Sequence, residues 1–593
     1  MKIRKNNSRW EKFTHYVKGL PENQLLLILA FVVGLGCGLA SVLLKSLIHA
    51  VQWLLIYIFG SPEESFMYLV LPGIGMLLAF LFVKYIVRDD IGHGVTKALL
   101  AVSKKRSVIK PHNTWTSLAA SSVTIGFGGS VGAEAPIVYT GAAIGSNIAR
   151  ILELSYKHRT ILLGCGAAGA VAGIFKAPIA GILFTLEILL FNISMTSILP
   201  LLISTVTATT VSYLFLGQDV SFSSSVDHYL LGNIPYYILL GVFCGFVSLY
   251  FTRMTLRLED KIKSIVNPYK RWAICALSLG ILIFIFPPLF GEGYDSLIHL
   301  LHADPESCFN QTIFGSLLDW EWFVPIFFAL VLIFKVFAMS FTNAGGGVGG
   351  TFGPTLIVGG IAGFILSRFI NLTGFTSLPE ANFVLVGMAG LMAGVMQAPM
   401  TAIFLIADIT GGYALLLPLI ISSTISFATI RLFEPYSIYT KRIAKNGQLL
   451  THDSDQAVLT LLSTAELIER DFMKVELDYT LRDLVRIVAQ SKRNLYPVVD
   501  KKGAFMGIIA LDDIRSIMFD QSKYDQVKVY ELMRLCDIRV LDDEHMESVM
   551  EKFEKSAVWN LPVVDSEGMY QGFISKSKIF SSYREQLQQV SHD

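Results

Sequence analysis

The sequence has few charged residues for its length. Of its 593 residues, 16% are Asp, Glu, Lys or Arg, whereas 53% are hydrophobic, and the mean hydropathy is +0.55. A soluble globular protein has about 25% charged residues, so the composition excludes an ordinary soluble protein and indicates a polytopic membrane protein. The net charge of +1 offers nothing that would attract nucleic acid, and we expect no such partner.

Cysteine is scarce, and motifs of metal or enzyme chemistry are missing. There are six cysteines and no C-x-x-C spacing. Four of them (Cys37, Cys165, Cys244 and Cys275) lie in apolar segments, which is typical of small packing residues. The sequence contains no H-E-x-x-H motif and no paired intramembrane aspartates. We therefore expect neither a bound metal nor an enzymatic activity.

Long uncharged runs are present, but Gly and Pro interrupt many apolar stretches. Runs of the roughly 20 residues that a bilayer requires occur at 23–44, 65–83, 188–218, 381–407 and 409–430. The other stretches are shorter or broken, as expected of tilted or half-spanning helices. The pattern predicts an α-helical membrane domain with interrupted helices.

Basic residues indicate the orientation in the membrane. Segment 1–22 is basic and has no cleavable-signal pattern, because the first apolar run is too long for the apolar core of a signal peptide. Further basic clusters occur at 104–110 and 253–271. The positive-inside rule places all three in the cytoplasm. We expect a multi-pass protein of the cell inner (plasma) membrane with a cytoplasmic N-terminus and tail.

Two glycine-rich segments look like copies of one another. They are Gly128-Gly-Ser-Val-Gly-Ala-Glu-Ala-Pro136 and Gly345-Gly-Gly-Val-Gly-Gly-Thr-Phe-Gly-Pro354, whose prolines are 218 positions apart. A second matching pair, 168–178 and 389–399, follows at an offset of 221. So consistent an offset indicates that one half of the membrane domain was duplicated. Proteins built from inverted repeats bind their solute between the halves, at helices interrupted in mid-bilayer.

The glycines suit an anion. Helix starts within the bilayer expose free N–H groups and the positive end of the helix dipole. The Gly-Gly pair before Thr351 and Phe352 should place their amides at such a start. Neutral amides bind an anion weakly enough to release it, as transport requires. The alternative is that the glycines only allow close helix packing. The pattern favours an anion transport protein.

The charge-dense tail contains a second repeat. Tyr496-Pro-Val-Val-Asp500 recurs as Leu561-Pro-Val-Val-Asp565, 65 positions later, and each copy is followed by a glycine turn and a second apolar run. Amphipathic stretches at 481–490 and 545–554 precede the copies. The pattern predicts a soluble tandem α/β module of strands and helices.

Three motifs, taken in order, resemble those of the CLC family of chloride channels and chloride/proton exchangers. Gly92-His-Gly-Val-Thr96 resembles G-S-G-I-P, Gly132-Ala-Glu-Ala-Pro136 resembles G-R-E-G-P, and Gly350-Thr-Phe-Gly-Pro354 resembles G-x-F-x-P. The tail resembles a pair of CBS domains. The resemblance implies a homodimer in which each subunit has its own anion pathway. The expected organisation is a segment 1–22, a CLC-like transmembrane domain 23–445 with inverted repeats at about 23–250 and 270–440, a linker 446–465, and CBS units 466–525 and 526–593.

Glu134 is the leading candidate for a functional side chain. No other acid or base lies between Lys110 and Arg150, and a carboxylate at membrane depth is functional by default. The resemblance implies that it is the gating glutamate, which occupies an anion site when ionised and leaves it when protonated. The resemblance also implies the anion-binding positions His93, Gly94, Val95, Gly132, Ala133, Gly350, Thr351, Phe352, Gly353 and Tyr439. Phe352 and Tyr439 would be the inner-gate aromatics, with Tyr436 as the alternative tyrosine.

Three departures from the family pattern affect the mechanism. His93 replaces the usual serine, so either its imidazole contacts the anion or it points away and the amides of Gly94 and Val95 bind. Alanines flank Glu134 where arginine and glycine are usual. Ile188 stands where many exchangers have a proton-transfer glutamate. Glu187 is one position away, which on a helix is a rotation of about 100°. The counterpart of Glu187 in the other repeat is Asp408, which suggests an architectural role for Glu187.

We expect transmembrane transport of chloride or a similar small anion through a glutamate-gated pore in each subunit. The residues favour a channel-like or uncoupled conductor, and the alternative is a chloride/proton antiporter. A magnesium transporter would need pore carboxylates where this sequence has glycine amides, and a membrane-embedded enzyme would need catalytic motifs.

The CBS pair raises the question of an adenine nucleotide. Such modules usually hold it with a Ser/Thr and an Asp three positions apart, after the second strand. The first unit offers Ala510 and Asp513, and the second Ser575 and Lys578. Asp513, Ser575 and Lys578 are therefore the candidate nucleotide-binding residues. The alternative is that the pair only strengthens the dimer.

Overall fold

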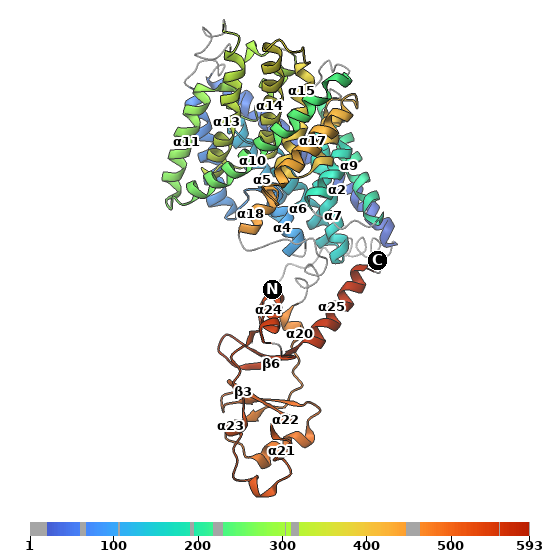
Figure 1. The fold of residues 1–593 in the computed structure, drawn as a ribbon, viewed down its shortest axis with the longest axis vertical. Helices are drawn as coiled ribbons and strands as arrows, with labels where there is room; N and C mark the ends of the chain where they lie inside the picture. The colour runs from blue at the N-terminus through green and yellow to red at the C-terminus, as the bar shows by residue number, and fades with distance from the viewer. Residues whose placement is uncertain are drawn as a thin grey trace, which may run out of the picture. The chain divides into compact units, whose positions relative to one another are not determined.

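The computed structural model describes residues 21–59, 67–104, 107–189, 195–217, 229–302, 304–309, 320–445, 463–556 and 558–591 (Figure 1). The chain forms two compact units, Met1–Leu450 and Thr451–Asp593. Nearly all of the predicted N-terminal segment 1–22 and linker 446–465 lies outside the described residues.

The first unit is helical throughout. Its α-helices are α2 (Glu22–Phe59), α3 (Met67–Leu81), α4 (Gly94–Lys104), α5 (Thr116–Gly126), α6 (Glu134–Ile151), α7 (Tyr156–Phe175), α8 (Pro178–Ile188), α9 (Met195–Leu216), α10 (Ile234–Lys263), α11 (Pro268–Ile285), α12 (Tyr294–Leu301), α13 (Phe323–Ala344), α14 (Phe352–Leu372), α15 (Glu380–Met396), α16 (Pro399–Ile409), α17 (Leu416–Arg431) and α18 (Ile438–Lys445). Within the described ranges, eight helices are long and apolar enough to cross a membrane, and several others are short apolar helices.

The predicted interruption of helices is most evident near residue 397. The uncharged run 381–407 is not one span, because α15 ends at Met396 and α16 begins at Pro399. Gln397 adopts a left-handed conformation (φ 53°), and Pro399 has no N–H for a continuing helix. Lys176, the equivalent position of the first repeat, is also left-handed (φ 58°) and separates α7 from α8.

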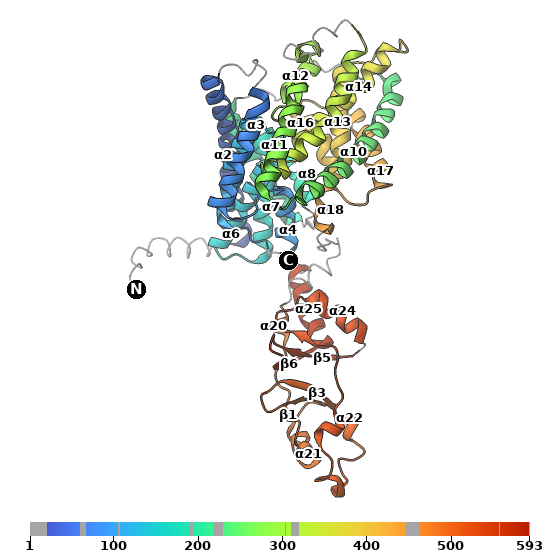
Figure 2. The same cartoon turned by 90° about the vertical axis from the view of Figure 1, so that its left-hand side faces the viewer.

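The helices form two bundles with the same arrangement, which can be followed in Figures 1 and 2. In the first, α2 packs on α7 and α9, and α6 packs on α7. In the second, α10 packs on α15 and α17, and α14 packs on α15. The unit is therefore built from two structural repeats, as the sequence offsets predicted.

Glycines let the paired helices approach closely in both repeats. A Cβ on Gly145 of α6 would lie 1.9 Å from the carbonyl oxygen of Leu162 on α7, and a Cβ on Gly363 of α14 would lie 1.9 Å from that of Phe383 on α15. Small residues commonly allow such contacts between membrane helices. Close packing is therefore the role of Gly145 and Gly363. The glycines of the two loops before α6 and α14 are not part of these helix contacts.

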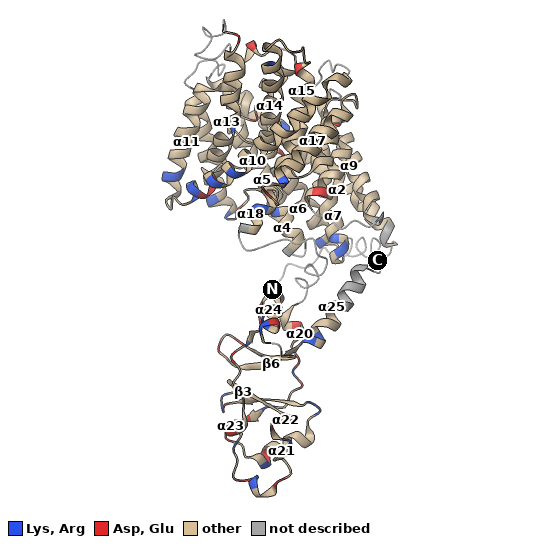
Figure 3. Ribbon diagram, in the orientation of Figure 1, with Lys and Arg blue, Asp and Glu red and all other residues tan. Residues whose placement is uncertain are grey.

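Charge is concentrated at one end of the first unit. Figure 3 shows Lys and Arg gathered at the end that carries α4 and α18, whereas most of the helix length is uncharged. Two ion pairs join α10 to the segment around α18: Arg253 Nε to Glu434 Oε1 at 2.6 Å, and Arg442 Nη2 to Glu259 Oε1 at 2.7 Å. These pairs hold α18 in place.

The second unit contains two copies of a small α/β fold. The first copy has α20 (Thr464–Leu467), β1 (Val475–Glu476), α21 (Leu481–Gln490), β2 (Leu495–Val499), β3 (Phe505–Ala510) and α22 (Leu511–Ile514); after α23 (Val529–Leu532), the second has β4 (Val540–Leu541), α24 (Met546–Ser556), β5 (Asn560–Val564), β6 (Tyr570–Ser575) and α25 (Lys576–Ser591). Each sheet has one parallel and one antiparallel pair, in the orders β1-β2-β3 and β4-β5-β6. The sequence predicted the longer strands and missed the two-residue strands β1 and β4.

Candidate functional site

The two glycine-rich loops meet between the repeats. The amide of Gly132 donates to the carbonyl of Gly350 (3.1 Å), and the amide of Gly350 donates back to the carbonyl of Gly132 (2.7 Å). Each loop leads directly into a helix, α6 at Glu134 and α14 at Phe352. The starts of α6 and α14 are therefore held against each other, as expected for a solute site between inverted repeats.

Glycine is required at this junction by the space available. A Cβ on Gly132 would lie 2.1 Å from Glu134 Oε2 and 2.9 Å from the amide nitrogen of Gly353. A Cβ on Gly350 would lie 2.8 Å from the side chain of Ala135. The loops therefore leave room for the Glu134 carboxylate beside the backbone of α14, which a larger residue would fill.

Glu134 is buried, with 2% of its surface exposed, and its carboxylate lies at the start of the opposite helix. Oε2 accepts the N–H of Gly353, the second residue of α14, at 3.2 Å. Oε1 accepts the hydroxyl of Tyr294, the first residue of α12, at 2.6 Å. The first four N–H groups of a helix have no partner within it, so the carboxylate occupies a position suited to an anion.

A second carboxylate lies at the start of α6. Glu292 Oε1 accepts the N–H of Ala133, the residue before Glu134, at 3.1 Å. The sequence analysis missed this residue and its neighbour Tyr294. The sequence pattern that could have revealed Glu292 is an acid between two glycines, in Phe290-Gly-Glu-Gly-Tyr294, a segment that joins two apolar stretches.

Two lysines in apolar helices accompany the carboxylates. Lys335 of α13 has no exposed surface, and its Nζ donates to the carbonyls of Gly291 (3.2 Å) and Glu292 (3.1 Å). Lys45 of α2 interacts electrostatically with Glu292 and Glu134. Both could have been found by the argument applied to Glu134, since each is an ionisable residue in an otherwise apolar helix.

Phe352 and Tyr439 lie deep in the unit. Phe352 is 1% exposed, and its ring packs on those of Phe175 (5.3 Å between centroids) and Phe184 (6.2 Å). Tyr439 is 2% exposed, and its hydroxyl lies 3.8 Å from Met396 Sδ. The alternative tyrosine, Tyr436, is 41% exposed, which favours Tyr439 for the inner position.

His93 is turned toward α10. Its Nε2 lies 3.5 Å from Glu259 Oε2, and Glu259 is itself paired with Arg442 of α18. The backbone of His93 is left-handed (φ 52°), and its carbonyl accepts the N–H of Lys97 at 3.2 Å. This orientation favours the alternative in which the imidazole points away from the anion.

The start of α4 packs on α6. A Cβ on Gly94 would lie 2.3 Å from the carbonyl oxygen of Ala135, so only glycine allows this approach. Gly94 and Val95 are the first two residues of α4 and are buried. Their amides therefore lie at a helix start that packs against the first turn of α6, which contains Glu134. This placement agrees with the alternative in which His93 points away and the amides of Gly94 and Val95 bind the anion.

Glu187 has a structural partner in the other repeat. Its carboxylate accepts the N–H groups of Met400 (3.0 Å) and Thr401 (2.7 Å) at the start of α16, and the Thr401 hydroxyl at 2.6 Å. Asp408 of α16 in turn accepts the N–H of Ala180 at the start of α8 (3.5 Å). Glu187 therefore caps a helix of the other repeat. Ile188 is 4% exposed and leaves its position apolar.

The candidate nucleotide residues of the tail already have partners. Asp513 accepts the N–H of Ala510 (3.1 Å) and pairs with the guanidinium of Arg534. The Ser575 hydroxyl donates to the carboxylate of Glu469 and accepts the N–H of Lys578 at 3.1 Å. A nucleotide would have to displace Arg534 from Asp513 and approach the negative charge of Glu469.

Comparisons with known proteins agree with this architecture. The sequence model of the family described as "Voltage gated chloride channel" matches residues 74–431, and that of the CBS domain matches residues 465–520. The chain is 26% identical over 566 residues to "Chloride channel protein CLC-e" of Arabidopsis thaliana (84% of this chain, 76% of the relative). It is 28% identical over 459 residues to "H(+)/Cl(-) exchange transporter ClcA" of Vibrio cholerae (72% and 92%).

Solved structures share the fold. A slow cyanobacterial Cl−/H+ antiporter superposes with a TM-score of 0.61 at 23% identity, over 72% of this chain and 99% of its own. A eukaryotic CLC transporter superposes with a TM-score of 0.59 at 17% identity, over 95% and 98%. Because the family model covers more than half of the chain, the protein belongs to the voltage-gated chloride channel (CLC) family and carries a C-terminal CBS domain pair.

Proposed function

We propose that this protein carries chloride or a similar small anion across the membrane, with Glu134 as the gate of a pathway in each subunit. The observation that carries the proposal is the hydrogen bond from the Gly353 amide to the Glu134 carboxylate at the start of α14. A carboxylate oxygen and a halide ion compete for the same amide donors. The ionised side chain therefore blocks the site that the anion needs.

Protonation opens this gate. A neutral carboxyl accepts weaker hydrogen bonds than a carboxylate does, so the side chain leaves the Gly353 amide and an anion takes its place. The amides of Ala133, Thr351, Phe352 and Gly353 at the starts of α6 and α14 then surround the ion. Gly132 and Gly350, whose amides donate to each other's carbonyls, line the same site. Phe352 and Tyr439 form the inner barrier, and the amides of Gly94 and Val95 provide the next contact.

The favoured mode is channel-like or uncoupled conduction. Ile188 is buried and apolar where a proton carrier would be needed, and Glu187 is engaged at the start of α16. Proton-coupled exchange is the second candidate, which is supported by the Vibrio cholerae relative named as an exchanger. It is also supported by the ionisable groups next to Glu134, which offer protons an alternative path.

A homodimer in the plasma membrane, with cytoplasmic N-terminus and tail, completes the proposal. Exposed apolar residues lie on α8, α9, α16 and α17: Ile179, Leu202, Val206, Met400 and Leu417. The partly exposed carboxylates of Glu187 and Asp408 belong to the same helices. A charge that faces lipid is costly, which favours cover by a second copy. The proposed extents are 23–445 for the transmembrane domain, 446–465 for the linker, and 466–525 and 526–593 for the CBS units.

The experiment is a flux assay with the purified protein in liposomes. A chloride gradient is applied without a proton gradient, and both chloride release and the pH of a weakly buffered medium are recorded. Chloride release without uphill proton movement supports conduction, and uphill proton movement establishes exchange. No anion flux would contradict the proposal itself.

Glu134→Gln tests the gate. We expect chloride flux to persist and its response to pH to disappear, together with any proton movement, because glutamine does not titrate. Glu187→Gln is the matched control, since Glu187 is another intramembrane glutamate bound to backbone amides, and its pH response should remain. An unchanged pH response in Glu134→Gln would contradict the assignment.

A further inference from the structure

One short segment contacts both sides of the candidate site. Residues Phe290–Tyr294, which we call the clasp, lead into α12, whose first residue is Tyr294, and contribute two side chains. The Tyr294 hydroxyl holds Glu134, and the Glu292 carboxylate accepts the Ala133 amide. Each of the two helix starts is therefore occupied by one carboxylate: Glu134 at α14 and Glu292 at α6.

We propose that Glu292 is a second gating carboxylate, which occupies the Ala133 amide and must release it before an anion can be fully bound. This inference rests on the proposed function and extends it, because it adds a specificity- and affinity-determining residue to the same site. The amide of Ala133 belongs to the helix start that would bind the anion, and in this structure its N–H is used by Glu292.

The backbone of the clasp is firmly held. The Gly291 amide donates to the carbonyl of Gly128 (3.0 Å), and Lys335 Nζ binds the carbonyls of Gly291 and Glu292. Gly291 (φ 58°) and Gly293 (φ 89°) are left-handed, which glycine adopts without strain. The Phe290 ring fills the space next to Gly128. The Glu292 side chain can thus leave the Ala133 amide by rotation about its own bonds, without movement of the clasp.

The charges around Glu292 make its release responsive to protons and anions. The Glu134 carboxylate of α6 repels Glu292, whereas the ammonium groups of Lys45 (α2) and Lys335 (α13) attract it. Two further groups act indirectly: the Tyr294 hydroxyl donates to Glu134, and the charge of Lys176 repels that of Lys45. A chloride ion that enters adds a negative charge beside two carboxylates, and repulsion is strong where water is scarce. Anion binding should therefore favour protonation of one carboxylate and displacement of Glu292.

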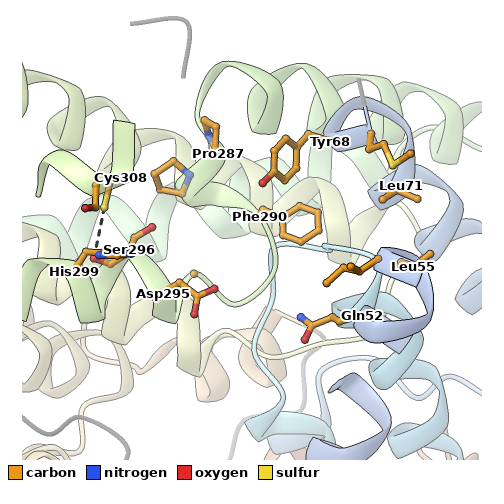
Figure 4. A pocket seen from close by; sticks show the side chains of 16 residues that line it. Gln52, Leu55, Tyr68, Leu71, Pro287, Phe290, Asp295, Ser296, His299 and Cys308 are labelled. Atoms are coloured by element: carbon orange, nitrogen blue, oxygen red, sulfur yellow. Dashed lines mark hydrogen bonds between the residues drawn. The ribbon is translucent and has the colours of Figure 1, made fainter. Parts of the chain in front are cut away.

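A cavity of about 390 Å³ reaches the clasp. Figure 4 shows Phe290 beside Tyr68 on its wall, with the polar side chains of Gln52, Asp295 and His299 also lining it. Gly293 of the clasp lines the same cavity. A cavity of this size with several polar groups has room for water, and it borders the clasp at Phe290 and Gly293.

The test measures chloride binding by isothermal titration calorimetry with sodium chloride on the purified full-length protein. Glu292→Ala frees the Ala133 amide and removes a negative charge, so chloride should bind about tenfold more tightly, on the scale of a charged hydrogen bond. Glu292→Gln keeps the shape and an acceptor but removes the charge. Its chloride affinity should therefore rise less than that of Glu292→Ala and vary less with pH than that of the wild type. Asp295→Asn, a nearby acid on the cavity wall, is the matched control and should resemble the wild type.

The outcomes separate this inference from the proposed function. Unchanged affinity and pH profile in both Glu292 variants, or weaker binding in Glu292→Ala, would overturn the role of Glu292 and leave the Glu134 gate intact. If Glu292→Ala does not fold, the isosteric Glu292→Gln still gives the pH profile. No chloride binding or flux by the wild-type protein would instead overturn the proposed function.

Discussion

The starts of α6 and α14 have nearly the same backbone and opposite side-chain chemistry. Both follow a glycine loop, and the two loops exchange hydrogen bonds through Gly132 and Gly350. At the first helical position, however, α6 has the acid Glu134 and α14 has the aromatic Phe352. The duplicated backbone supplies amides from both sides, whereas the side chains that differ would supply the charged gate and the apolar barrier of the proposed function.

The pairs that remained alike have structural roles. Gly145 and Gly363 allow close helix contacts, and the acids Glu187 and Asp408 cap a helix of the other repeat. The comparison indicates that equivalent positions with the same chemistry maintain the architecture, and we infer that equivalent positions with different chemistry are where a function is carried.

The largest effect should come from a change to the matched glycines. Gly145→Val and Gly363→Val each put a side chain where a Cβ already lies 1.9 Å from a backbone carbonyl, and such overlap in a packed helix pair cannot be relieved by side-chain movement. Both variants should give little folded protein by size-exclusion chromatography. Gly412→Val is the control, since a Cβ at Gly412 meets nothing within 4 Å. A well-folded, active Gly145→Val would show that α6 and α7 do not need this contact.

The reciprocal caps should give a smaller and unequal effect. Glu187 accepts three hydrogen bonds, at 2.6–3.0 Å, whereas Asp408 accepts two longer ones, from the Ala180 amide and the Tyr413 hydroxyl, both at 3.5 Å. Loss of a helix cap costs about 0.5–2 kcal/mol. We expect Glu187→Ala to lower the melting temperature in detergent clearly, and Asp408→Ala to lower it less. A larger fall in melting temperature for Asp408→Ala would show that the number and length of the hydrogen bonds do not decide how much each cap stabilises the protein.

The sequence was sufficient for the parts of the site that lie in motifs. The repeat offset predicted that the loops before Glu134 and Phe352 would meet, because helices that bind a solute in inverted repeats face each other. The family fold, the interrupted helices and the CBS pair followed from motif order and periodicity. The break at Gln397 was also available from the sequence, since Pro399 cannot continue a helix.

The rest of the site depends on tertiary contacts that no local pattern reveals. Glu292 is 159 residues from the amide it accepts, and Lys335 is more than 40 residues from the clasp. The orientation of His93 depends on Glu259 of α10, a residue without a motif of its own. Side-chain direction is decided by such distant partners, so the sequence left the two alternatives for His93 open.

The tail sharpens the comparison, because its equivalent positions differ in the sign of their charge. Asp513 corresponds to Lys578, and Arg534, which pairs with Asp513, corresponds to Glu469, which accepts the Ser575 hydroxyl. By the rule above, such a difference should carry a function. Asp513 and Ser575, however, already have protein partners, and Glu469 is further paired with Arg493 at 2.7 Å.

We therefore expect the smallest effect from adenine nucleotides, which should bind the full-length protein weakly and change chloride flux little. The carboxylate of Glu469 repels phosphate, and a ribose hydroxyl must compete with Arg534 for Asp513. Glu469→Gln removes the repulsion and should strengthen ATP binding, measured by calorimetry, whereas Asp525→Asn, a surface acid paired with Arg482, should not. Tight binding of ATP to the wild-type protein would mean that the clefts rearrange and that charge reversal in the tail marks a nucleotide site.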